Sequence, residues 1–110
     1  MTQFKPPSTL SITINSHVHN ATLVNYKTVT PPLKLDGKLL ICRAVYVSQC
    51  NSITIVWFVS FYQENNHVYH VASYCITNNI KSLEPLIKTF LDIDSFKKWL
   101  HDFEKRGKMR

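Results

Sequence analysis

Residues 52–62 read SITIVWFVSFY, a stretch without charge, glycine or proline. Its β-branched and aromatic residues favour a β-strand. Because successive side chains alternate between faces, one face is wholly apolar and consists of Ile53, Ile55, Trp57, Val59 and Phe61. The other face is largely apolar and consists of Thr54, Val56, Phe58, Ser60 and Tyr62. An exposed edge of this composition would invite aggregation, so we expect the strand to lie in the centre of a sheet.

Alternating apolar residues predict strands on both sides of this stretch, at 9–18, 22–30, 39–48 and 68–76. Asp36-Gly37 between apolar flanks predicts a type I′ hairpin turn, since glycine adopts positive φ without a Cβ penalty. We expect Pro31-Pro32 to end the second strand, and further turns near 19–21, 49–51 and 63–66. The strand at 39–48 carries one charged exception among its apolar positions, Arg43.

The apolar spacing becomes helical after residue 77. The first helix has Ser82 as its expected N-cap and an apolar set of Leu83, Leu86, Ile87, Phe90 and Leu91. A second helix starts at Ser95 with Asp94 as its expected cap, and its apolar stripe consists of Phe96, Trp99, Leu100 and Phe103. If this stripe lies in the core, changing Trp99 or Phe103 to alanine costs about 3–5 kcal/mol.

The predicted fold is therefore α+β: an antiparallel meander sheet of four to five strands, followed by a C-terminal helical segment packed on one face. The length of 110 residues suits one domain. We expect a flexible leader at 1–8, the domain at 9–107 and a basic tail at 108–110.

The formal net charge of +6 favours anionic partners, although charge alone also serves solubility. Three cysteines, Cys42, Cys50 and Cys75, cannot all pair within one chain, which favours a reducing compartment. No apolar run is long enough to span a bilayer, which needs about 20 residues. These features together predict an intracellular protein, cytoplasmic or nuclear.

Two histidine pairs are the candidate metal ligands, His17 with His19 and His67 with His70, joined by Cys50 or Cys75. No Cys-x-x-Cys spacing accompanies them, so no metal site and no cofactor are predicted. The sequence also has no glycine-rich phosphate loop and no cysteine at a helix N-terminus. We therefore expect no catalytic residues, no small-molecule substrate and no enzymatic activity.

The apolar residues of the second face of 52–62 suggest a protein interface formed by Val56, Phe58 and Tyr62. An uncovered sheet face of this kind would suit a protein partner or a second copy related by a two-fold axis. The predicted function is a small non-enzymatic interaction or regulatory module that self-associates. Short chains of this composition without catalytic motifs are also common among viral accessory proteins.

The alternative is a protein that binds single-stranded nucleic acid. Such proteins combine cations that contact phosphates with aromatic side chains that stack on bases. The candidate phosphate contacts are Lys97, Lys98, Lys105 and Arg106, and the candidate stacking platforms are Tyr46 and Tyr69. The steep salt dependence of phosphate contacts would separate this function from an apolar protein interface.

Overall fold

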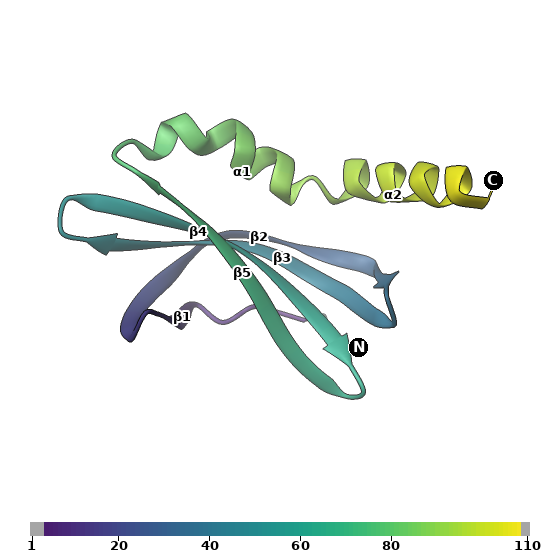
Figure 1. Ribbon diagram of the computed structural model, residues 1–110, viewed down its shortest axis with the longest axis horizontal. Coiled ribbons are helices and arrows are strands. Elements are labelled where there is room, and N and C mark those ends of the chain that lie inside the picture. Colours follow the sequence, from purple (N-terminus) through teal and green to yellow (C-terminus); the bar gives the residue numbers. More distant parts are fainter. Residues whose placement is uncertain (1–3, 109–110) are drawn as a thin grey trace.

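A computed structural model describes residues 4–108 of the chain, with side-chain detail through Arg106 (Figure 1). Five strands form one antiparallel sheet in sequence order: β1 (Thr9–Ile14), β2 (His17–Leu35), β3 (Lys38–Cys50), β4 (Ile53–Glu64) and β5 (His67–Thr77). A 3₁₀ turn, η1 (Ile80–Leu83), leads into the helices α1 (Glu84–Leu91) and α2 (Ile93–Lys108). The α+β meander with a C-terminal helical segment is confirmed, and β4 has a strand on each side as expected.

Two-residue turns with positive φ at both positions connect three of the hairpins. They are Asn15–Ser16, Asp36–Gly37 and Asn65–Asn66, and asparagine, aspartate and glycine tolerate this backbone best. The turn expected near 19–21 is wrong, because these residues lie in β2 and Ala21 pairs with Leu10 of β1. The alternation of β1 ends earlier, at Ile14, where Asn15 adopts the left-handed conformation.

Strand β2 does not end at Pro31-Pro32 but continues to Leu35. Its register with β3 shifts between Thr28 and Leu33, and the prolines fall within that irregular part. Proline lacks a backbone N–H, so it fits where regular ladder pairing is already interrupted. β2 therefore continues past Pro31-Pro32, where the sequence predicts the end of the strand.

A bulge in β3 changes which side chains share a face. Leu40 pairs with Tyr62 and Cys42 pairs with Phe61, which leaves Ile41 as the extra residue. Ile41 consequently joins the cluster that contains Cys42, whereas Leu40 packs with the start of α2. Without the bulge, alternation would have placed Leu40 and Cys42 on the same face of the sheet.

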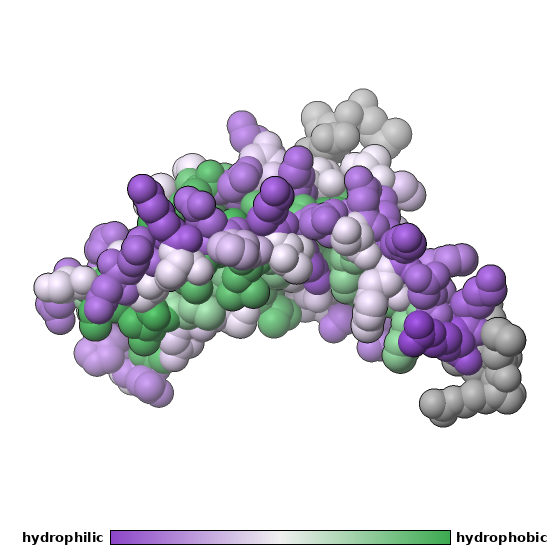
Figure 2. All heavy atoms as spheres, turned by 90° about the horizontal axis from the view of Figure 1, so that it is seen from above, coloured by the Kyte–Doolittle hydropathy of each residue, from purple (hydrophilic) through white to green (hydrophobic). Residues whose placement is uncertain are grey.

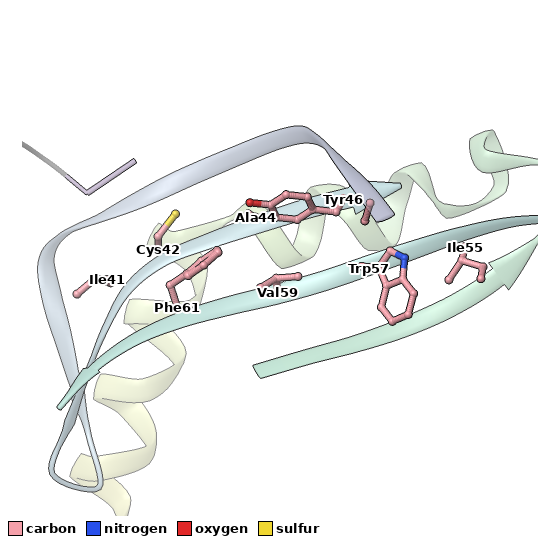
Figure 3. Close-up of a cluster of buried hydrophobic side chains, with 9 residues drawn as sticks. Ile41, Cys42, Ala44, Tyr46, Ile55, Trp57, Val59 and Phe61 are labelled. Atoms are coloured by element: carbon pink, nitrogen blue, oxygen red, sulfur yellow. The ribbon is translucent and has the colours of Figure 1, made fainter. Parts of the chain in front are cut away.

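One face of the sheet carries the main buried cluster, shown in Figure 3 on the side of β3 and β4 that faces away from the helices. Residues of β1 and the segment Phe4–Ser8 cover this cluster. The Phe4 ring lies 5.1 Å from the Phe61 ring, and the Tyr46 hydroxyl donates a 2.6 Å hydrogen bond to the Pro7 carbonyl oxygen. Phe4–Ser8, part of the leader expected at 1–8, thus packs against the core, whereas residues 1–3 lie outside the described part of the chain.

Helix α1 covers the opposite face, where its apolar side packs on Val45, Val56 and Phe58. Helix α2 begins on the same face, with Ile93 buried among residues that include Val29 and Leu40. The helices are separated at Asp92, and beyond its first turns α2 extends away from the sheet (Figure 1).

Asp92, and not Asp94, caps α2. Its carboxylate oxygens accept hydrogen bonds from the Ser95 backbone N–H (3.1 Å) and the Ser95 hydroxyl (2.7 Å). These bonds lower the pKa of Asp92 below its ordinary value, because they favour the charged form. The cap satisfies a backbone N–H group at the start of α2 that has no partner within the helix.

The expectation that the whole α2 stripe packs on the sheet is wrong. Trp99 is 57% exposed and Phe103 is 60% exposed. Phe96 and Leu100 are partly buried, and Phe96 packs against the cluster of Val29, Leu40 and Ile93. Of the expected basic tail, Lys108 is the last residue of α2, and residues 109–110 lie outside the described part of the chain.

Candidate protein-interaction surface

A groove of about 490 Å³ lies where β5, α1 and α2 meet above the sheet. Its lining is mainly apolar and aromatic, and we refer to it as the helix groove; it comprises Arg43, Phe58, Ser73, Cys75, Leu86, Thr89, Phe90, Asp92, Ser95, Phe96 and Trp99. Seen from the helix side, hydrophobic side chains gather along one long edge of the molecule, below a row of hydrophilic side chains (Figure 2). Concave apolar surfaces with a few polar groups are typical of binding sites.

Arg43 of β3 is the one charged side chain that the sheet contributes to this groove. Its guanidinium lies between two aromatic rings, 4.7 Å from the centre of the Phe90 ring and 4.4 Å from that of Phe96. Its Nη1 donates a 3.2 Å hydrogen bond to the Phe90 carbonyl oxygen, in the last turn of α1. A cation at this position compensates the partial negative charge of a helix C-terminus. Arg43 therefore joins the sheet to both helices.

The charge of Arg43 is nevertheless incompletely compensated. Its Nε is buried without a hydrogen-bond partner among the described residues, and no described carboxylate forms an ion pair with it. Burial lowers the pKa of Arg43 below its ordinary value, but a guanidinium remains protonated in proteins. Partly buried charges normally have a counter-charge, and Arg43 has none among the described residues.

The aromatic stripe of α2, consisting of Phe96, Trp99 and Phe103, continues the groove outward. Neighbouring rings stack, with centres 6.0 Å apart for Phe96 and Trp99 and 5.4 Å apart for Trp99 and Phe103. Asp102 and Arg106 lie beside the outer two rings, around a small hollow of about 90 Å³. Exposed aromatic side chains grouped in this way mark interaction surfaces more strongly than single exposed apolar residues do.

The structure corrects the interface expected on the second face of β4. Val56 is 0% exposed and Phe58 is 6% exposed, because α1 packs on them. Tyr62 is partly buried and stacks on Tyr69 of β5, with ring centres 5.7 Å apart. A partner could therefore reach Val56 and Phe58 only if α1 moved.

The structure also separates the residues of the nucleic-acid alternative. Tyr46 is 0% exposed and its hydroxyl is bonded to Pro7, so its ring offers no surface to a base. Lys97 donates a 2.8 Å hydrogen bond from Nζ to the Thr30 carbonyl oxygen. Lys98, Lys105 and Arg106 are exposed on α2. Of the predicted set, these three cations remain available, whereas Tyr46 does not.

The two histidine pairs lie at opposite ends of the sheet, as the strand register requires. His17, His19 and Cys50 line one shallow pocket, and the His19 ring lies 5.6 Å from the ring of Trp57. Within residues 4–108, no three His, Cys, Asp or Glu side chains are placed to hold a metal ion.

All three cysteines are unpaired. Burial raises the pKa of the Cys42 thiol to about 12, which keeps it protonated at neutral pH and makes it a poor nucleophile. None of the described helices is long and apolar enough to cross a membrane.

Sequence reasoning missed the helix groove, since its walls come from segments far apart in the chain. A signal for it did exist: Arg43 is the one charged residue within the apolar run 39–47 of β3, and such a residue requires either a counter-charge or a functional reason. Comparisons with protein-family models, with curated proteins and with solved structures find no match to this chain.

Proposed function

We propose that this protein is a non-enzymatic, intracellular protein-interaction module that binds through the helix groove and the aromatic stripe of α2. The observation that carries the proposal is the exposure of Trp99 and Phe103 directly beside an apolar groove. Aromatic anchors beside a hydrophobic pocket supply most of the binding energy in protein interfaces. The free cysteines are consistent with a reducing compartment.

The test immobilises three forms of the full chain, namely wild type, a stripe variant and a control variant, and compares the proteins that each captures from a cell extract. The stripe variant carries Trp99→Ser and Phe103→Ser. The control variant carries His101→Ser and Lys105→Ser, which lie on the opposite side of the same helix. All three forms should unfold at similar temperatures, because the changed residues are exposed.

We expect wild type and control to retain the same partner and the stripe variant to lose it. Equal retention by all three forms would contradict the proposal. Because apolar contacts depend weakly on salt, the retained partner should also resist elution at high salt.

The cations Lys98, Lys105 and Arg106 around the exposed rings of Trp99 and Phe103 keep nucleic-acid binding as a second candidate. Aromatic rings can stack on bases while neighbouring cations contact phosphates. Binding of a fluorescent single strand would then weaken steeply with salt, with a log–log slope of about −0.7 for each phosphate contact. In that case the control variant, which lacks Lys105, should bind the strand less tightly than wild type, as the stripe variant should. If neither wild type nor the control variant binds the strand at low salt, this candidate is excluded.

A further inference from the structure

The aromatic stripe of α2 and the helix groove have complementary chemistry within the same chain. The groove offers an apolar wall and the incompletely compensated guanidinium of Arg43. The outer part of the stripe offers the exposed rings of Trp99 and Phe103 with the carboxylate of Asp102 beside them. Phe96 and Trp99 already line the groove of their own copy. Asp102 and Phe103 lie farther along the same continuous helix, so one copy cannot bring them back onto its own groove.

We propose that the occupant of the helix groove is α2 of a second copy, in a two-fold symmetric dimer whose α2 helices cross in antiparallel orientation. In a two-fold interface each contact occurs twice, so each copy would give its stripe and receive that of the other. The proposal rests on the function proposed above, since it names the partner of that same surface.

The spacing along α2 suits this arrangement. If the two-fold axis passes near Trp99, an antiparallel pairing at 1.5 Å per residue sets Phe103 of one copy opposite Phe96 of the other. Phe96 lies against Arg43, 4.4 Å from its guanidinium carbon. Asp102 flanks the stripe and lines the same hollow as Trp99 and Phe103, so it would approach Arg43 of the second copy. A carboxylate there would supply the missing counter-charge.

The exposed area matches a modest dimer. A fully buried aromatic side chain covers about 150–250 Å², and Trp99 and Phe103 are each more than half exposed. Together with Leu86, which is 47% exposed, they leave roughly 300–400 Å² of apolar surface per copy. That is the apolar share of an interface of about 600 Å² per partner, the size of a weak or transient complex. We therefore expect a dissociation constant in the micromolar range.

The experiment is sedimentation equilibrium of the purified full chain over about 1–200 μM, a range that brackets micromolar dissociation constants. Wild type and the His101→Ser/Lys105→Ser control should shift from monomer to dimer with concentration. The Trp99→Ser/Phe103→Ser variant should remain monomeric throughout. A wild type that stays monomeric at the highest concentration, or a stripe variant that still dimerises, would overturn the inference.

A matched pair of charge variants tests the contact with Arg43. Arg43 is left unchanged because it also holds the last turn of α1. Asp102→Lys should weaken dimerisation tenfold or more, because it sets two cations against each other, as like charges at an interface are strongly unfavourable. Glu104→Lys makes the same change of charge on the other side of the helix and should leave dimerisation within about twofold of wild type. Equal effects of the two variants would overturn the assignment of the Arg43–Asp102 contact.

The two proposals fail in different ways. A monomeric wild type whose captured partner is lost in the stripe variant would refute the dimer and retain the interaction module. A monomeric wild type whose captured proteins do not depend on Trp99 and Phe103 would refute both.

Discussion

Strand β4 and helix α2 each carry a continuous apolar pattern with a tryptophan near its centre, but the structure buries only one of them. Trp57 of β4 is 1% exposed, and its indole Nε1 donates a 2.9 Å hydrogen bond to the Ser48 hydroxyl. Trp99 of α2 is 57% exposed and contacts the other two rings of its own stripe. Periodicity shows which residues share a face, whereas only tertiary structure shows whether the chain itself covers that face.

The largest expected difference is in the free energy of unfolding. Trp57→Ala should lower it by about 3–5 kcal/mol, because the change leaves a cavity in the main cluster and an unpaired Ser48 hydroxyl. Urea denaturation followed by circular dichroism measures this loss. A decrease below about 1 kcal/mol, typical of a surface site, would show that β4 is not the centre of the core.

Alkaline pH should destabilise the folded protein through two buried side chains of β3, Cys42 and Tyr46. Burial raises the pKa of the Cys42 thiol from 9.0 to about 12. Burial, with a smaller contribution from the Cys42 charge, raises the pKa of the Tyr46 hydroxyl from 10.0 to about 12. The unfolded chain therefore loses these protons at lower pH than the folded chain does.

The free energy of unfolding should consequently be insensitive to these groups below about pH 8 and fall as the pH rises from about 9 towards 12. Urea titrations at a series of pH values test this. Cys42→Ala should remove the earlier part of the decline, and Tyr46→Phe the later part. If both single variants lose free energy of unfolding with pH in the same way as wild type, the assignment to these two groups is contradicted.

Ser48→Ala makes a smaller change at the same site. It leaves the buried indole N–H of Trp57 without its acceptor, at a cost of about 1–3 kcal/mol. Thermal unfolding should detect the loss, and Ser48→Thr, which keeps the hydroxyl, serves as the comparison. Equal melting temperatures for wild type and Ser48→Ala would show that the hydrogen bond contributes little.

Trp99→Ala should change the free energy of unfolding by no more than about 0.5 kcal/mol, because its ring is largely exposed in the monomer. Denaturation at low protein concentration, where a dimer would dissociate, is the appropriate measurement. A loss comparable to that of Trp57→Ala would mean that α2 packs on the core after all.

The fluorescence of the two tryptophans should also differ in its accessibility to quenchers in the folded protein. Iodide, a charged quencher that does not enter protein cores, should quench Trp99 in the Trp57→Phe variant and leave Trp57 in the Trp99→Phe variant nearly unaffected. Quenching of Trp99 should decrease as protein concentration rises if the stripe is buried between two copies. Similar quenching of both variants at low concentration would contradict the difference in burial.

Local chemistry in the sequence predicts much of the fold. The composition of residues 52–62 identifies β4 as a central strand, and Asp36-Gly37 identifies a hairpin because both positions need positive φ. The bulge at Ile41 and the irregular pairing around Pro31-Pro32 are not predicted, since they depend on how neighbouring strands align. They change which residues share a face without changing the order of the strands.

The candidate site is less predictable than the fold. Phe96, Trp99 and Phe103 are recognisable as an apolar stripe, but their exposure depends on how α2 lies relative to the sheet after the break at Asp92. The environment of Arg43 depends on Phe90, a residue 47 positions away in the sequence. A pattern within one element cannot encode a contact whose partner belongs to another.

The segment Phe4–Ser8 has a consequence for the order of events during synthesis. It leaves the ribosome before the strands, but its binding site on Tyr46 and Phe61 exists only after β4 has been made. At about 5–20 residues per second, the roughly 50 intervening residues take several seconds, during which consecutive hairpins can already form. Phe4–Ser8 therefore docks only after β4 has been made, although it precedes all five strands in the chain.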